Sequence, residues 1–88
     1  MNNSNYTLLD QEFEYFIENQ QDIFKKYGNK YVIIKDKQVA ASFEDEITAI
    51  IESRNKFDKG TYIIQKSGPD SSVYSLNSHI STITFQVV

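Results

Sequence analysis

The chain has 88 residues, of which 40% are hydrophobic and 24% charged, and its net charge is −3. This composition is typical of one small folded domain rather than a disordered chain. The acidic balance gives no electrostatic reason to expect nucleic-acid binding, and the lack of cysteine excludes disulfides and thiol chemistry. No apolar run approaches the roughly 18 residues of a membrane-spanning helix. The first residues also lack a basic stretch followed by an apolar one, so we expect no membrane partner and a cytoplasmic location.

An amphipathic helix is the first predicted element, after a frayed terminus over residues 1–6. Thr7 and Asp10 form a capping box, with Asp10 as an alternative N-cap. Lys25 and Lys26 occupy the last predicted turn, and Gly28 follows as a helix-ending residue. Intervals of three and four residues define one apolar stripe, made of Leu9, Phe13, Phe16, Ile17, Gln20, Phe24 and Tyr27.

A β-hairpin follows, since the apolar runs Tyr31–Ile34 and Val39–Ala41 flank a short polar turn. If Asp36 and Lys37 form a two-residue loop, the expected facing pairs are Ile34 with Val39, Ile33 with Ala40, and Val32 with Ala41. Lysine adopts positive φ less readily than glycine or asparagine, so a longer, bulged turn is the alternative.

The second half of the chain predicts another helix and further strands. Ser42 and Asp45 form a second capping box, and this helix should end near Asn55. Its predicted buried side consists of Phe43, Ile47, Ile50, Ile51, Arg54 and Phe57. Thr61–Lys66 and His79–Val87 are predicted strands, and Val73–Leu76 is an optional short strand between them.

These elements predict an α+β fold in the order α-β-β-α-β-β, with one optional further strand. Two amphipathic helices need an apolar surface to cover, and a sheet supplies it. We therefore expect residues 7–88 to form a single two-layer sandwich, with both helices on one face of a mainly antiparallel sheet. Short connections place the first strand between the second and the third.

The hairpin and its flanks also carry a pattern of residues seen elsewhere, over roughly Phe16–Ile64. The pattern consists of Tyr27-Gly28-Asn29-Lys30-Tyr31-Val32, Asp36, Val39-Ala40 and Ala49. It resembles a small prokaryotic domain family of unknown function, often encoded near retropepsin-like aspartic proteases. Lys37 stands where that family tends to have glycine, and the uncharged C-terminal segment is not part of its pattern. The family has no established catalytic residues, so the resemblance implies a fold and no activity.

Catalytic chemistry has little support in the sequence. His79 is the single histidine, and no second ligand or nucleophile accompanies it in a recognisable spacing. Gly28, Gly60 and Gly68 are isolated and indicate turns rather than a phosphate-binding loop. We expect no enzyme, no metal site and no cofactor.

Two surfaces are candidates for binding a protein partner. Four acidic residues spaced by four, with Tyr15 nearby, form either a docking face for a basic partner or a solvated helix face; they are Asp10, Glu14, Glu18 and Asp22. The second candidate lies in Ser71–Val88, where His79 is the one side chain that could carry a charge. Apolar and polar residues alternate in the last part of this segment, which is expected to form either an interior strand or an edge strand. An edge strand would pair with a partner or a second copy, through Thr82, Thr84, Phe85, Gln86 and Val87.

The function expected from these features is a non-enzymatic protein-interaction or regulatory module. It would act through the C-terminal strand edge or the acidic first helix, on a protein partner or on a second copy of the chain. The alternative is a small-ligand-binding regulatory domain with a pocket between helices and sheet, lined by Tyr27, Tyr31 and Tyr62.

Overall fold

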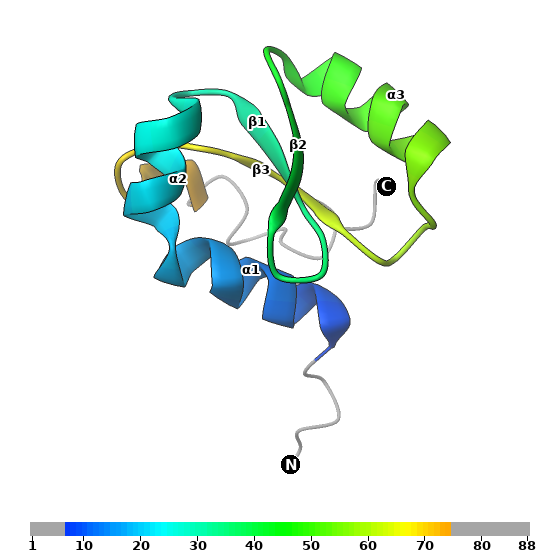
Figure 1. Cartoon of the computed structure of the whole chain (residues 1–88), viewed down its shortest axis with the longest axis horizontal. Coiled ribbons are helices and arrows are strands. Elements are labelled where there is room, and N and C mark those ends of the chain that lie inside the picture. The colour runs from blue at the N-terminus through cyan, green and yellow to red at the C-terminus, as the bar shows by residue number, and fades with distance from the viewer. Residues whose placement is uncertain (1–6, 75–88) are drawn as a thin grey trace.

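The computed structural model describes residues 7–74. Along them the order is α1 (Leu8–Glu18), α2 (Gln20–Tyr27), β1 (Tyr31–Ile34), β2 (Val39–Phe43), α3 (Glu46–Lys56) and β3 (Ile63–Lys66) (Figure 1). The predicted frayed terminus and the predicted last strand, His79–Val87, lie outside the described residues. None of the helices within residues 7–74 has the length and apolarity needed to cross a membrane.

The first helix is divided in two at Asn19, so the prediction of one continuous helix is wrong. Its start is confirmed: the Thr7 side chain accepts from the Asp10 N–H, and the Asp10 carboxylate accepts from the Thr7 N–H at 2.8 Å. Asn19 leaves helical geometry (φ −113°, ψ 15°), and its side-chain amide donates to the Tyr15 carbonyl at 2.9 Å. Asparagine competes with the backbone for such bonds, which explains a break that apolar periodicity does not reveal. Gly28, at φ +67°, ends α2 as predicted.

The hairpin turn is the predicted two-residue loop. Asp36 and Lys37 have φ values of 55° and 56°, and the Lys35 N–H donates to the Gln38 carbonyl at 3.0 Å. Positive φ at both central residues is the signature of a type I′ turn, whose twist matches the flanking strands. The predicted pairing of Ile34 with Val39 is confirmed.

Beyond that pair the register shifts by one residue, so two predicted pairs are wrong. Ile33 faces Ala41 and Val32 faces Ser42, which leaves Ala40 as an extra residue on β2. The shift places Phe43 opposite Tyr31, where both side chains pack against the apolar cluster under α3. Burying an aromatic ring accounts for this register.

The three described strands form one antiparallel sheet in the order β2-β1-β3. The prediction that the first strand lies centrally is confirmed. β3 begins at Ile63, two residues later than predicted. Val73 and Tyr74 belong to a short helical turn at residues 72–74, so these two residues do not form the optional strand predicted at Val73–Leu76. The other two residues of that predicted strand lie outside the described residues.

The predicted buried side of α3 is confirmed in part, since Phe43, Ile50 and Phe57 pack against the apolar cluster under this helix, whereas Arg54 is exposed. Ala49 and Ser53 are fully buried, whereas Ile47 and Ile51 are 69% and 49% exposed. Small side chains on the inner side allow the helix backbone to approach the sheet closely. Asp45 is its N-cap and accepts from the Thr48 N–H at 2.9 Å; Ser42 belongs to β2, so the predicted second capping box is wrong.

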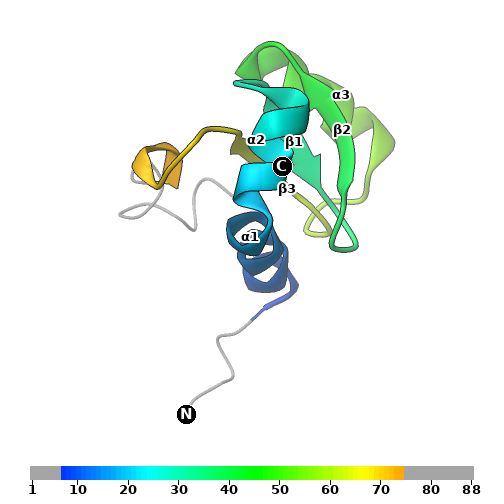
Figure 2. The same cartoon turned by 60° about the vertical axis from the view of Figure 1, so that its left-hand side comes forward.

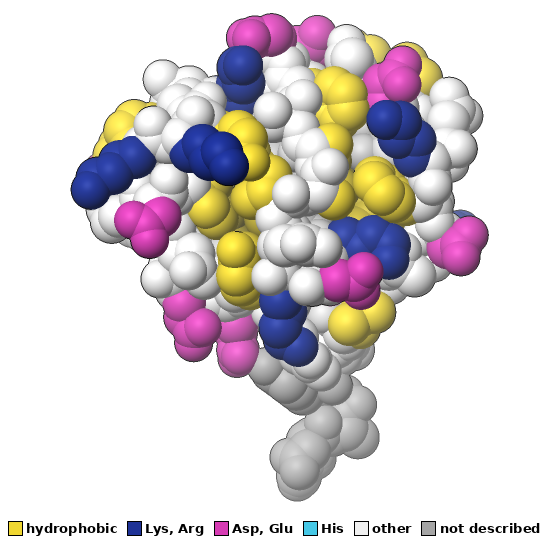
Figure 3. Space-filling model, in the orientation of Figure 1, with side chains coloured by type: hydrophobic (Ala, Val, Ile, Leu, Met, Phe, Trp, Pro, Cys, Tyr) yellow, Lys and Arg dark blue, Asp and Glu magenta, His cyan; other side chains and the backbone are white. Residues whose placement is uncertain are grey.

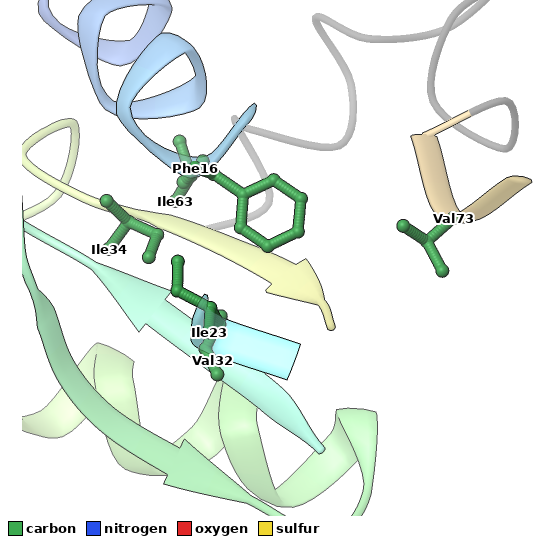
Figure 4. Packing of buried hydrophobic residues seen from close by; sticks show 6 residues of the cluster. All are labelled: Phe16, Ile23, Val32, Ile34, Ile63 and Val73. Carbon is green, nitrogen blue, oxygen red and sulfur yellow. The ribbon is translucent and has the colours of Figure 1, made fainter. Parts of the chain in front are cut away.

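The helices cover opposite faces of the sheet, and the prediction of both on one face is therefore corrected (Figures 1 and 2). One apolar cluster joins α1 and α2 to the sheet through Phe16, Ile23, Val32, Ile34, Ile63 and Val73 (Figure 4). The other lies under α3 and contains Ile33, Ala49, Tyr62 and Ile64. The central strand explains this arrangement, because Val32, Ile33 and Ile34 are all fully buried and a run of that kind needs cover on both faces.

The segment after β3 is attached to α2 by hydrogen bonds. The buried Gln20 amide donates to the Gly68 and Asp70 carbonyls at 2.8 and 2.9 Å, and its oxygen accepts from the Tyr74 hydroxyl. Gln20 was predicted to lie on the buried stripe, and its polar end is used for these contacts.

Candidate functional site: the free edge of β2 and its groove

The strand β2 lies at one edge of the described sheet. It ends the sheet order, and within residues 7–74 no other strand lies beside it. Its sequence, VAASF, contains no charged residue and no proline, two of the features that protect edge strands from pairing. Figure 2 shows β2 at the periphery of the sheet. Such an edge presents backbone N–H and C=O groups to a further strand.

An open groove of about 370 Å³ lies on one side of this edge. Its walls come from the end of α1, from α2 and from the first residues of β2: Tyr15, Asn19, Asp22, Ile23, Lys26, Tyr27, Gln38 and Val39. The break at Asn19 brings the two helices into a single wall. The Lys26 ammonium lies 5.4 Å from the centroid of the Tyr27 ring, a cation–π distance.

The opposite side of β2 is apolar as well. Ala41 and Phe43 are half-buried against the cluster under α3, whereas Val39 packs on the α1–α2 side. Figure 3, which looks onto β2, shows hydrophobic side chains on both sides of the strand. A strand added at this edge would therefore find apolar contacts for both of its alternating rows of side chains.

Glu12 fixes the hairpin to α1. Its side chain is fully buried, and its two carboxylate oxygens accept from the Asp36 and Lys37 N–H groups, each at 2.9 Å. Charge-assisted bonds to two successive amides hold the left-handed turn and set the position of β2 over the groove. Sequence reasoning missed this residue. The available signal is its spacing, three residues after Leu9 and four before Phe16, which places a carboxylate on the apolar stripe.

The structure divides the predicted acidic row. Asp10 is engaged in the helix cap, Glu14 and Glu18 are exposed on α1, and Asp22 belongs to α2. Asp22 and the predicted Tyr15 both line the groove. The five predicted C-terminal binding residues lie outside the described residues; they are Thr82, Thr84, Phe85, Gln86 and Val87.

The three tyrosines of the predicted ligand pocket do not meet. Tyr27 lines the groove, while Tyr31 packs on the α3 side of the sheet with the Lys66 ammonium 4.8 Å from its ring centroid. Tyr62 is fully buried under α3, and its hydroxyl has no hydrogen-bond partner among residues 7–74. Burial raises the pKa of this phenol, and the nearby Arg54 charge opposes that rise.

Two carboxyl groups outside the groove have a clearly lowered pKa. Hydrogen bonds from the Thr48 backbone and side chain lower the pKa of Asp45, and bonds from Ser72 lower that of Asp70. Among residues 7–74, no group of three or more His, Asp or Glu side chains is placed to hold a metal ion. The site therefore offers a binding partner a shaped groove, apolar contacts and the backbone groups of an edge strand.

Comparison of the chain with protein-family models, with curated proteins and with solved structures gives no match in any of the three.

Proposed function

We propose that this chain is a non-enzymatic protein-interaction or regulatory module that accepts an extended segment of a protein partner along the free edge of β2. One observation carries the proposal: an uncharged edge strand lies beside an open groove and is held there by a buried carboxylate. Strand addition of this kind draws affinity from backbone hydrogen bonds and specificity from pockets for alternate side chains.

In this proposal each row of the partner's side chains would meet its own surface. One row would enter the groove beside Tyr15, Tyr27 and Val39. The other would lie over Ala41 and Phe43. Since Glu12 already fixes the turn, the hairpin need not be ordered on binding, which lowers the entropic cost of association.

Peptide display against the folded chain tests this proposal. Selected peptides are expected to alternate apolar residues and to slow amide hydrogen exchange along Val39–Phe43. Ala40 is exposed on the edge, so Ala40→Lys should lower peptide affinity by about tenfold or more. Asn55→Lys adds the same charge at the exposed end of α3 and should change nothing. Peptides that bind Ala40→Lys as tightly as the wild type would refute the β2 edge as the binding site.

We also propose two further contact surfaces, the acidic residues of α1 and the C-terminal segment. If the exposed α1 acids select a basic partner, Glu14→Lys with Glu18→Lys should slow association and reduce its salt dependence. An association rate unchanged across a salt series would leave these acids as a solvated helix face. For the C-terminal segment, Thr84→Lys with Gln86→Lys should weaken any assembly built on that segment.

A small-ligand-binding regulatory domain is the second candidate, supported by the groove itself. Its volume of about 370 Å³ falls within the range of known ligand sites, and it combines two tyrosines with Asp22 and Lys26. A fragment screen by NMR tests it. Compounds that shift the groove resonances, with peptides that leave β2 unprotected, would favour this candidate over strand addition.

A further inference from the structure

Opposite charges lie at the two ends of β2. The turn before the strand contains Lys35, Asp36 and Lys37, and the residues after it are Glu44, Asp45 and Glu46. Lys35 pairs with the neighbouring Asp36 at 3.3 Å, and Lys30 pairs with Glu44 at 3.3 Å. Among the exposed side chains this leaves the Lys37 ammonium at the turn, which donates to the Gln11 side chain at 3.1 Å, and Asp45 and Glu46 at the other end. The Glu12 carboxylate also lies at the turn, but it is fully buried against the Asp36 and Lys37 N–H groups.

This layout is complementary to itself in one orientation. Two copies of β2 placed side by side and antiparallel bring the turn of each copy to the acidic end of the other. The same contact then occurs twice, as a two-fold axis requires. A parallel placement would instead bring like charges together at both ends.

From this charge pattern, the geometry points to a second copy of the chain as the occupant of the β2 edge. The two sheets would join into one continuous antiparallel sheet with β2 against β2 of the partner copy. This inference rests on the proposed function in that both use the same edge, and it names the partner.

The strand suits such a contact, and it also limits the strength of the contact. Ala40, Ala41 and Ser42 are small, so side chains near the axis leave room for close approach. In Figure 1 β2 is the strand nearest the viewer, with α2 and α3 to either side of it. The extra residue at Ala40 leaves Ala41–Phe43 as the regularly paired part of β2. A short pairing of this kind gives a weak, concentration-dependent dimer.

Sedimentation equilibrium of charge variants tests the inference, over about 10 µM to 1 mM protein and at about 0.05 M salt, where exposed charges are weakly screened. The wild type is expected to dimerise. Lys37→Glu alone or Glu46→Lys alone creates two like-charge contacts and should weaken the dimer by about tenfold or more. An equimolar mixture of the two variants restores both contacts and should recover association as a heterodimer. Circular dichroism of each variant establishes that it is folded.

Two variants serve as charge-matched controls. Lys59→Glu lies in the exposed turn before β3, and Glu52→Lys lies on the exposed side of α3. Neither should alter dimerisation, nor should their mixture form heterodimers more readily than the wild type.

Three outcomes overturn the inference: a monomeric wild type at the highest concentration, a dimer indifferent to Lys37→Glu and Glu46→Lys, or a mixture that fails to recover. A monomer that still binds displayed peptides along β2 would leave the proposed function standing with another partner. A chain that neither self-associates nor binds such peptides would rule out both the dimer and the proposed function.

Discussion

Glu12 joins two parts of the chain that are far apart in sequence. Its carboxylate is fully buried and accepts from the N–H groups of Asp36 and Lys37, more than twenty residues away. A turn with two consecutive left-handed residues is costly for side chains other than glycine, asparagine and aspartate. The two bonds offset part of this cost, because they satisfy amides that point away from the hairpin ladder.

We expect Glu12→Ala to lower the free energy of unfolding by about 2–4 kcal/mol, since it leaves two amides without their acceptor. Glu12→Gln keeps one acceptor oxygen and should lose about half as much. Urea denaturation monitored by circular dichroism measures both. The exposed Glu18→Ala is the control, with an expected change under about 0.5 kcal/mol. A loss that small for Glu12→Ala would show that water replaces the carboxylate.

Tyr62 presents the opposite case, a buried polar group that makes no hydrogen bond within residues 7–74. Its hydroxyl has no partner in the described part of the chain, and removing it with Tyr62→Phe should leave stability unchanged or raise it by up to about 1 kcal/mol. The ring keeps its contact with Phe57, whose centroid lies 5.4 Å away. Thermal denaturation measures the effect. Destabilisation beyond about 1 kcal/mol would reveal a hydrogen bond through a bound water.

At the scale of elements, the hairpin turn is formed by residues that are not ideal for it. Lys37 has a φ of 56°, in the region that favours glycine. The turn nevertheless forms, because Glu12 binds its amides and the flanking strands are buried.

Replacing Lys37 with glycine should therefore stabilise the fold by about 0.5–1 kcal/mol, by relieving the left-handed conformation of a non-glycine residue. Gln38→Gly is the matched control. Gln38 does not have a positive φ, so glycine at this position should destabilise the fold by a similar amount. Both are measured by denaturant unfolding at low protein concentration. Destabilisation by Lys37→Gly would mean that packing of the lysine stem outweighs the backbone strain.

At the scale of the whole molecule, the sheet is a central layer with an apolar cluster on each face. Phe16 is fully buried in the cluster under α1 and α2, 6.3 Å from Phe13 and 6.1 Å from Tyr74, centroid to centroid. Its ring connects the first helix, the central strand and the segment after β3.

Phe16→Ala should destabilise the protein by about 3–5 kcal/mol, the usual cost of an empty aromatic site in a core. A single unfolding transition seen by both far-ultraviolet and tyrosine signals would indicate that the two faces unfold together. The exposed Ile51→Ala is the comparison, with a change under about 1 kcal/mol expected. A loss under about 1 kcal/mol for Phe16→Ala would contradict the buried position of its ring.

Features set by neighbouring residues were predictable from the sequence. The Thr7 capping box, the helix end at Gly28 and the two-residue turn at Asp36 and Lys37 depend on a few adjacent φ and ψ angles and on bonds between near neighbours. The central position of β1 also followed, because short connections leave few topologies. Of the candidate site, the sequence indicated Tyr15 and Asp22, but it indicated neither the groove that they line nor the free edge of β2 beside it.

The tertiary structure decided which surfaces meet. Periodicity favoured Ile47 and Ile51 for the inner side of α3, yet Ala49 and Ser53 occupy it, because small residues let the helix approach the sheet. The layering followed from Val32, Ile33 and Ile34, whose burial on alternate faces requires a helix on each side. Glu12 gained its role only when folding brought the turn to α1. The physical reason is range: a cap or a turn is closed by residues within a few positions, whereas the face that a helix buries depends on the shape of distant segments packed against it.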